Sequence, residues 1–104
     1  MVKFELVITF VNTGFADQVM NAAREVGARG GTIIHARGTA TKEMEKKYGV
    51  VITPDKEMVL ILVNTKIKDK VLSAIYKEAG LQTAGQGIAF SLPVEDVVGL
   101  KFDQ

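Results

Sequence analysis

The sequence predicts a single α+β domain in which an antiparallel, four-stranded sheet carries two helices on one face. Three observations lead to this prediction. At 104 residues, the chain has the length of one domain, covering 1–104. Apolar residues alternate from Lys3 to Val11, three further short segments are predicted to be strands, and apolar residues recur at helical spacing along two others. These segments follow the order strand, helix, strand, strand, helix, strand, which is the split βαβ, or ferredoxin-like, plan.

The first strand and the first helix are predicted from Lys3 to Gly27. Apolar and polar residues alternate from Lys3 to Val11, as they do in a strand with two different faces. Thr13 suits a helix N-cap, and Asp17 suits its first turn. The apolar stripe of this helix runs from Phe15 to Val26, and Gly27 is its expected stop.

The second strand is predicted from Gly31 to Arg37, and a polar segment follows it. The residues from Gly38 to Gly49 show no core-forming period. We therefore expect an exposed loop over about 38–51, with room for one helical turn. Long loops inside compact domains are uncommon and often functional.

The second half of the chain repeats the pattern of the first half. A third strand is predicted from Glu57 to Val63, and a second helix has its apolar stripe from Ile67 to Ile75 and ends at Gly80. The fourth strand is predicted from Gly87 to Leu92. It is expected to end at Pro93, because proline cannot donate to a strand ladder.

The third strand is apolar on both faces, which a sheet with one open face does not need. It reads "MVLILV" from Met58 to Val63. Four further residues are expected to extend the second apolar surface: Val7, Val11, Ile34 and Ala36. Exposed apolar patches of this size mark interfaces. The sequence therefore predicts a homo-oligomer built on the open faces of the sheets.

Composition argues against several functional classes. A net charge of +1 gives no reason to expect nucleic-acid binding. The chain has no cysteine, and its only histidine, His35, is interpreted as a strand residue rather than a zinc ligand. Ser73 and Ser91 lack the strand-to-helix turn of a nucleophilic serine. No apolar run reaches membrane-spanning length, and no signal-peptide pattern is present. The expectation is a cytoplasmic, non-enzymatic protein without membrane insertion, metal site or catalytic residue.

Two glycine-rich turns carry more information. The turns "GARGG" and "AGQG" precede strands at equivalent places in the two halves. Free N–H groups in such turns form anion-binding concavities. The alternative is that they are tight helix-to-strand turns, because neither a Walker pattern nor G-x-G-x-x-G is present.

The segments "GARGGTIIHARGT" and "AGLQTAGQGIAFSLPVEDVVGL" resemble the PII signal-transduction family, and the likeness extends from the first strand to Lys101. The resemblance implies a homotrimer of ferredoxin-like subunits that binds an adenine nucleotide (ADP, AMP or ATP) between subunits. It also implies that a flexible loop docks onto a partner such as a transporter or an enzyme, in nitrogen or related metabolism. Such proteins are not enzymes.

The resemblance also assigns positions. It places Gly31 and Thr32 at the adenine, Ile61 at an apolar wall of the pocket, Arg37 and Gly38 at the loop base, Gly85, Gln86 and Gly87 at the phosphates, and Lys101 across the interface from them.

The chain departs from the family pattern where phosphate charge is bound. Ile88 replaces a lysine and Gly99 replaces an arginine, and each lost cation removes a contact worth about 1.5–3 kcal/mol. The loop is also shorter and lacks a glutamine at its base. These departures favour a nucleotide with fewer phosphates over ATP. They leave open whether 2-oxoglutarate or bicarbonate is sensed, and whether Tyr48 is modified.

Two other classes with the same fold stay open at this point. One is a trimeric protein of the copper-tolerance CutA type, with a structural or metal-linked role. The other is a small acyl-phosphate hydrolase. That enzyme would need an arginine in a phosphate loop after the first strand, and "VNTGF" has none.

Overall fold

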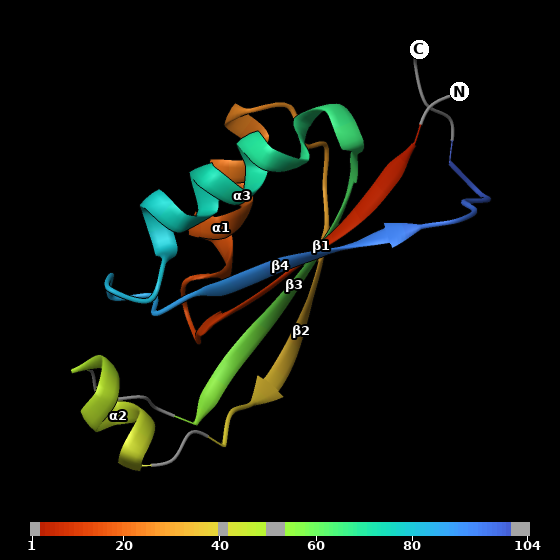
Figure 1. Cartoon of the computed structure of the whole chain (residues 1–104). Coiled ribbons are helices and arrows are strands. Elements are labelled where there is room, and N and C mark those ends of the chain that lie inside the picture. Colours follow the sequence, from red (N-terminus) through yellow and green to blue (C-terminus); the bar gives the residue numbers. More distant parts are fainter. Residues whose placement is uncertain (1–2, 40–41, 50–53, 101–104) are drawn as a thin grey trace.

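The chain folds into a sheet with two helices on one face and a third, short helix beyond its end (Figure 1). The computed structural model describes residues 3–39, 42–49 and 54–100, without the side chains of Met44 and Tyr48. The elements are β1 (Phe4–Asn12), α1 (Ala16–Glu25), β2 (Thr32–Arg37), α2 (Lys42–Tyr48), β3 (Asp55–Asn64), α3 (Thr65–Ala79) and β4 (Ile88–Val94). The strand order is β2-β3-β1-β4, and all neighbours are antiparallel. This confirms the ferredoxin-like prediction.

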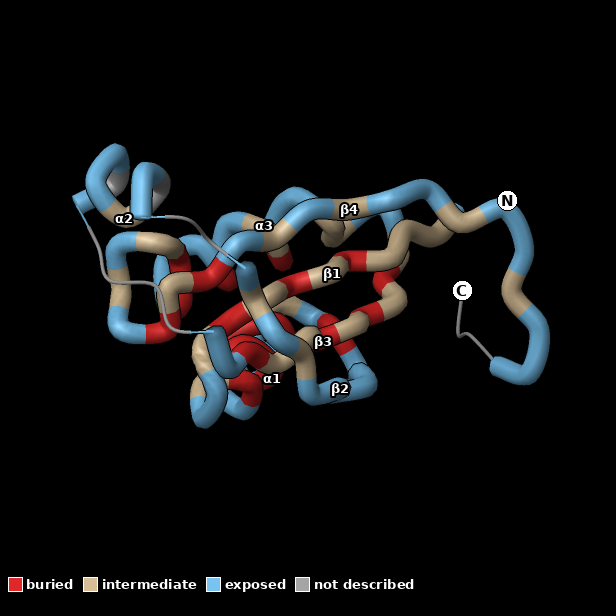
Figure 2. The backbone as a smooth tube through the Cα atoms, turned by 90° about the horizontal axis from the view of Figure 1, so that it is seen from below, coloured by how far each residue is buried: buried red, intermediate tan, exposed pale blue. Residues whose placement is uncertain are grey.

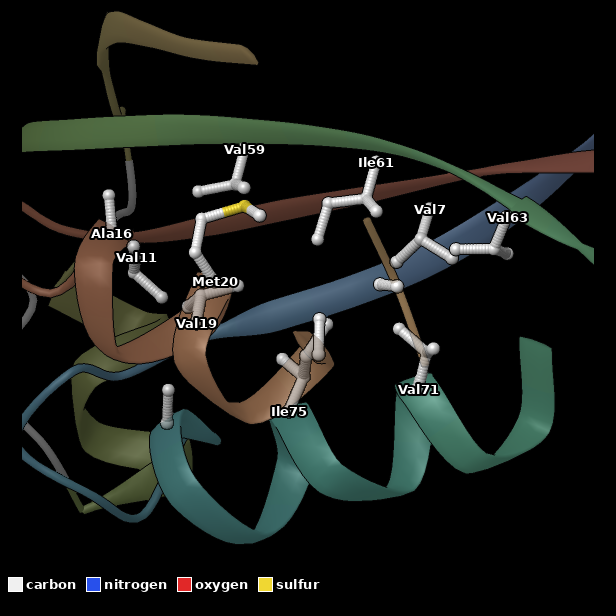
Figure 3. Packing of buried hydrophobic residues seen from close by; sticks show 13 residues of the cluster. Val7, Val11, Ala16, Val19, Met20, Val59, Ile61, Val63, Val71 and Ile75 are labelled. Carbon is white, nitrogen blue, oxygen red and sulfur yellow. The ribbon is translucent and has the colours of Figure 1, made fainter. Parts of the chain in front are cut away.

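The core lies between the sheet and the helices α1 and α3. Alternate residues of β1 and β3 point toward the helices and meet their apolar stripes (Figure 3). The largest fully buried side chains of this core are Ile61, Ile75, Val7, Val11, Val19, Val59 and Val71. We call the side of the sheet that they line the covered face.

The opposite side, which we call the open face, is also apolar. The register places Ile8 of β1 between Leu60 of β3 and Phe90 of β4, and Phe10 lies beside Ile88. The expectation of a second apolar surface is therefore met, but two of its residues were assigned wrongly. Val7 and Val11 lie in the core, because the helices cover the odd-numbered side of β1.

The helix ends show how local chemistry sets the boundaries. Gly27, with φ of 111°, follows α1, and its N–H and that of Ala28 bond to the carbonyls of Arg24 and Ala23. This is a Schellman ending, and it confirms the predicted stop. The N-cap of α1 is Phe15, without a side-chain hydrogen bond, so the prediction of Thr13 as the cap was wrong.

The fourth strand does not end at Pro93 as predicted. β4 continues to Val94, and Pro93 lies opposite Glu5 of β1. β4 is an edge strand of the sheet, where a residue without an N–H can face away from the ladder. Proline therefore stays within the strand because of its place at the edge.

The polar segment after β2 contains more helix than expected. Lys42–Tyr48 forms α2, where the sequence predicted at most one turn in a loop. Its acidic residues, Glu43 and Glu45, lie in the first turn, and Lys46 and Lys47 lie in the last. This arrangement complements the helix dipole. In Figure 1, α2 lies beyond the ends of β2 and β3, apart from the two packed helices.

Candidate ligand-binding site

A polar cluster interrupts the open face where β1 and β3 meet the glycine turn before β4. Lys56 of β3 lies opposite Asn12 of β1 and opposite Ala36 of β2. Its Nζ donates to Oδ1 of Asn12 at 2.6 Å. The amide Nδ2 of Asn12 donates to the carbonyl of Ala84 at 3.0 Å and to Oε1 of Gln86 at 3.2 Å. The cluster thus connects a strand lysine to the turn that was predicted to bind phosphate.

The backbone of the turn is held by its own hydrogen bonds. The N–H of Gly85 donates to Oγ1 of Thr83 at 3.3 Å, and that of Gln86 donates to the carbonyl of Thr83 at 3.0 Å. The N–H of Gly87 donates to the carbonyl of Ala79 at 2.6 Å. The expectation of free N–H groups at these three positions was therefore wrong, because the turn closes on itself and on α3. Gln86 adopts a left-handed conformation, with φ of 48°.

At two of the predicted site glycines, Gly31 and Gly87, contacts within the chain explain why the residue is glycine. A Cβ at Gly87 would collide with the carbonyl of Ala79, and one at Gly31 would lie 2.7 Å from the carbonyl of Leu60. Glycine is required at both positions because neighbouring backbone passes too close for a side chain. The alternative of tight helix-to-strand turns therefore accounts for these two glycines.

The predicted loop base lies against the same cluster. The N–H of Gly38 donates to the carbonyl of Pro54 at 2.6 Å, which closes the segment that contains α2. A Cβ at Gly38 would lie 3.3 Å from Cε of Lys56, so the lysine stem fills this space. Arg37 is exposed at the end of β2, opposite Asp55. Lys56 thus brings the loop base and the glycine turn together.

The other predicted site residues are not gathered into this cluster. Thr32 is exposed at the far end of β2, opposite Leu60, and Ile61 is a fully buried core residue. Ile88, which stands where the family pattern has a lysine, is 52% exposed on the open face. Lys101 lies outside the described residues.

Sequence reasoning missed Lys56 and Asn12, although the sequence carried a signal for the lysine. In "DKEMVLILV", Lys56 shares its strand parity with Met58, Leu60 and Leu62, so a cation stands on an otherwise apolar face. Only 9% of its surface is exposed, and burial lowers the pKa of its ammonium. A lysine held in this way is a candidate ligand contact.

Other polar features of the described residues do not add to the cluster. His35 is exposed on β2, opposite Glu57, whose Oε1 accepts from the N–H of Gly14 at 2.7 Å. Across residues 3–39, 42–49 and 54–100, no three His, Cys, Asp or Glu residues are placed to hold a metal ion. No helix within those ranges has the length and apolarity needed to cross a membrane.

The fold defines a ferredoxin-like α+β domain, and the comparison with family models identifies its family. Residues 4–104 match the model of the family described as nitrogen regulatory protein P-II. The chain belongs to this family. Its members are regulatory signalling proteins, typically trimers that bind nucleotides and interact with target proteins. Of the three classes that the sequence left open, the family model matches the PII family rather than the CutA type or the acyl-phosphate hydrolases. No curated protein sequence matches the chain.

Solved structures agree with this assignment. The chain is 27% identical to Arabidopsis thaliana PII bound to citrate, with a TM-score of 0.72, covering 96% of this chain and 82% of that one. A PII-like signalling protein from Thermus thermophilus is 18% identical, with a TM-score of 0.67 and coverage of 89% and 87%. The B. subtilis GlnK-ATP complex is 13% identical, with a TM-score of 0.68 and coverage of 88% and 82%. The last two share the fold.

Proposed function

We propose that this protein binds an adenine nucleotide between copies of the chain, on the open face of the sheet, and acts as a cytoplasmic, non-enzymatic regulator. The observation that carries the proposal is the Lys56 cluster, which places a positive charge between the glycine turn and the loop base. The segment 38–51 then signals to a protein partner such as a transporter or an enzyme, in nitrogen or related metabolism.

The order of residues along the open face supports a nucleotide over a simple anion. Three cross-strand pairs follow one another from Thr32 with Leu60, through Ile34 with Met58, to Ala36 with Lys56. Ala36 is four residues further along the strand than Thr32, a distance of about 13 Å. A hydroxyl and apolar side chains therefore lie at one end, suited to a base, and an ammonium lies at the other, suited to phosphate.

Lys56 also compensates for the two basic residues of the family pattern that this sequence lacks. Ile88 and Gly99 stand where the family pattern has basic residues. The ammonium of Lys56 is nevertheless close to the turn, because it donates to Asn12, whose amide donates to Gln86. In the proposal, Lys56 and Lys101 supply the phosphate charge. With two cations in place of the four that the site would have if Ile88 and Gly99 were basic, we expect fewer phosphates to be bound.

The test is calorimetric titration of the full chain with adenosine, AMP, ADP and ATP. We expect ADP to bind more tightly than adenosine. Lys56→Met should weaken ADP binding about tenfold, the effect of one charge-assisted hydrogen bond, while adenosine binding stays unchanged. Lys101→Ala should act in the same direction.

Lys70→Met, at an exposed position of α3, is the matched control and should bind as the unchanged chain does. Equal losses for ADP and adenosine in Lys56→Met would show that Lys56 does not contact phosphate. Absence of binding by every nucleotide would contradict the proposed function.

A further inference from the structure

The glycine turn and the loop base belong to different halves of the chain, and two side chains connect them. Gly38 rests against the stem of Lys56, whose ammonium bonds to Oδ1 of Asn12. Asn12 reaches the turn from its side chain, through Ala84 and Gln86, and from its backbone, whose N–H donates to the carbonyl of Gly85 at 2.8 Å. Asn12 is therefore bonded to the lysine and to three consecutive residues of the turn.

An asparagine amide suits this place because it carries an acceptor and two donors on one planar group. The ammonium of Lys56 has donors only, so it needs Oδ1. The carbonyl of Ala84 and Oε1 of Gln86 are acceptors, so they need Nδ2. An aspartate would keep the lysine contact but lose both donors, and an alanine would lose all three bonds.

The lysine retains capacity for a ligand in this arrangement. An ammonium carries three donors, and Asn12 takes one of them. In the proposal, the remaining two donate to phosphate oxygens. Because the bond to Asn12 fixes the position of Nζ, less side-chain entropy is lost when an anion binds.

We propose that Asn12 is the positioning residue of this site: it holds the Lys56 ammonium in place for phosphate and locks the glycine turn to it. The inference rests on the proposed function and adds to it a physical link between the two segments. Phosphate charge bound at Lys56 then registers at the loop base, through the lysine stem against Gly38, and at the turn, through Asn12 and Gln86.

The experiment is an NMR titration of the full chain with pyrophosphate, which supplies phosphate charge without a base. The signals followed are the Lys56 side chain and the backbone amides of Gly38, Gly85 and Gly87. In the unchanged chain, all should shift along one binding curve. Asn12→Ala should weaken pyrophosphate binding about tenfold, as expected for the loss of a charge-assisted positioning contact, and should uncouple the turn signals from that of Lys56.

Gln86→Ala separates positioning from stability, because it removes one link to the turn and leaves the lysine contact. It should weaken pyrophosphate binding less than Asn12→Ala does, because only one ordinary hydrogen bond is lost, while reducing the shift at Gly87. Asn21→Ala, at an exposed position of α1, is the matched control and should behave as the unchanged chain.

Three results would overturn the inference: no shift of Lys56 with pyrophosphate, unchanged affinity in Asn12→Ala, or turn signals that still follow Lys56 in that variant. The proposed function fails separately. If pyrophosphate binds as described but no adenine nucleotide binds more tightly than pyrophosphate, Asn12 keeps its positioning role and the nucleotide assignment is lost.

Discussion

The two faces of the sheet are built from the same strands, yet one is buried against the helices and the other is partly exposed. On the covered face, Val59 and Ile61 are fully buried against the helices. On the open face, Ile88 and Leu92 of β4 are 52% and 49% exposed, although they are no less apolar. In Figure 2, β4 shows exposed and intermediate residues, whereas β1 and β3 include buried ones. The strand pattern therefore creates two apolar surfaces, and the helices α1 and α3 cover only one of them.

The largest expected effect comes from placing a charge on the covered face. Val59→Lys should lower the free energy of unfolding by about 4 kcal/mol, because the ammonium would be buried without a partner. Thermal unfolding followed by circular dichroism measures this loss. Leu60→Lys is the matched variant, one residue away on the open face.

Leu60→Lys sharpens the comparison of the two faces. It should change subunit stability by only about 0.5 kcal/mol, yet abolish self-association at micromolar concentration in sedimentation. If the unchanged chain sediments with the mass of one chain, the proposed interface on the open face is contradicted. Equal unfolding of both variants would show that the two faces do not differ.

A medium effect is expected where the glycine turn closes over the core. Gly87→Val should destabilise the chain by about 3 kcal/mol without any ligand, because the new side chain would meet the carbonyl of Ala79 and the side chain of Val11. Gly85→Ala is the control, since its Cβ would lie 3.4 Å from Phe15 and is nearly accommodated. Chemical denaturation of both variants measures the difference. If Gly87→Val lost only nucleotide binding, the glycine would serve ligand approach rather than packing.

The smallest effect concerns a polar atom on the covered face. Thr9 is fully buried, and its Oγ1 has no hydrogen-bond partner among the described residues. Thr9→Val should therefore raise the free energy of unfolding by about 1 kcal/mol, the cost of an unsatisfied hydroxyl. Thr32→Val, exposed on the open face, should be neutral. A loss of stability in Thr9→Val would reveal a bonded hydroxyl.

The candidate site was only partly predictable. The family resemblance placed Gly38 and Gln86 in the site, and the structure brings these two to one cluster. It gave no role to Asn12 or Lys56, because their importance comes from contacts across 44 residues of sequence. The free N–H groups expected of the turn are used by Thr83 and Ala79, which no local pattern indicates.

The sequence by itself determined the strands, the two packed helices and the stop at Gly27, because these depend on periodicity and on local backbone conformation. Tertiary structure alone decided which side of β1 the helices cover, that Pro93 stays in an edge strand, and that Lys56 reaches Asn12. Periodicity says which side chains share a face, but only packing of distant segments decides what that face meets.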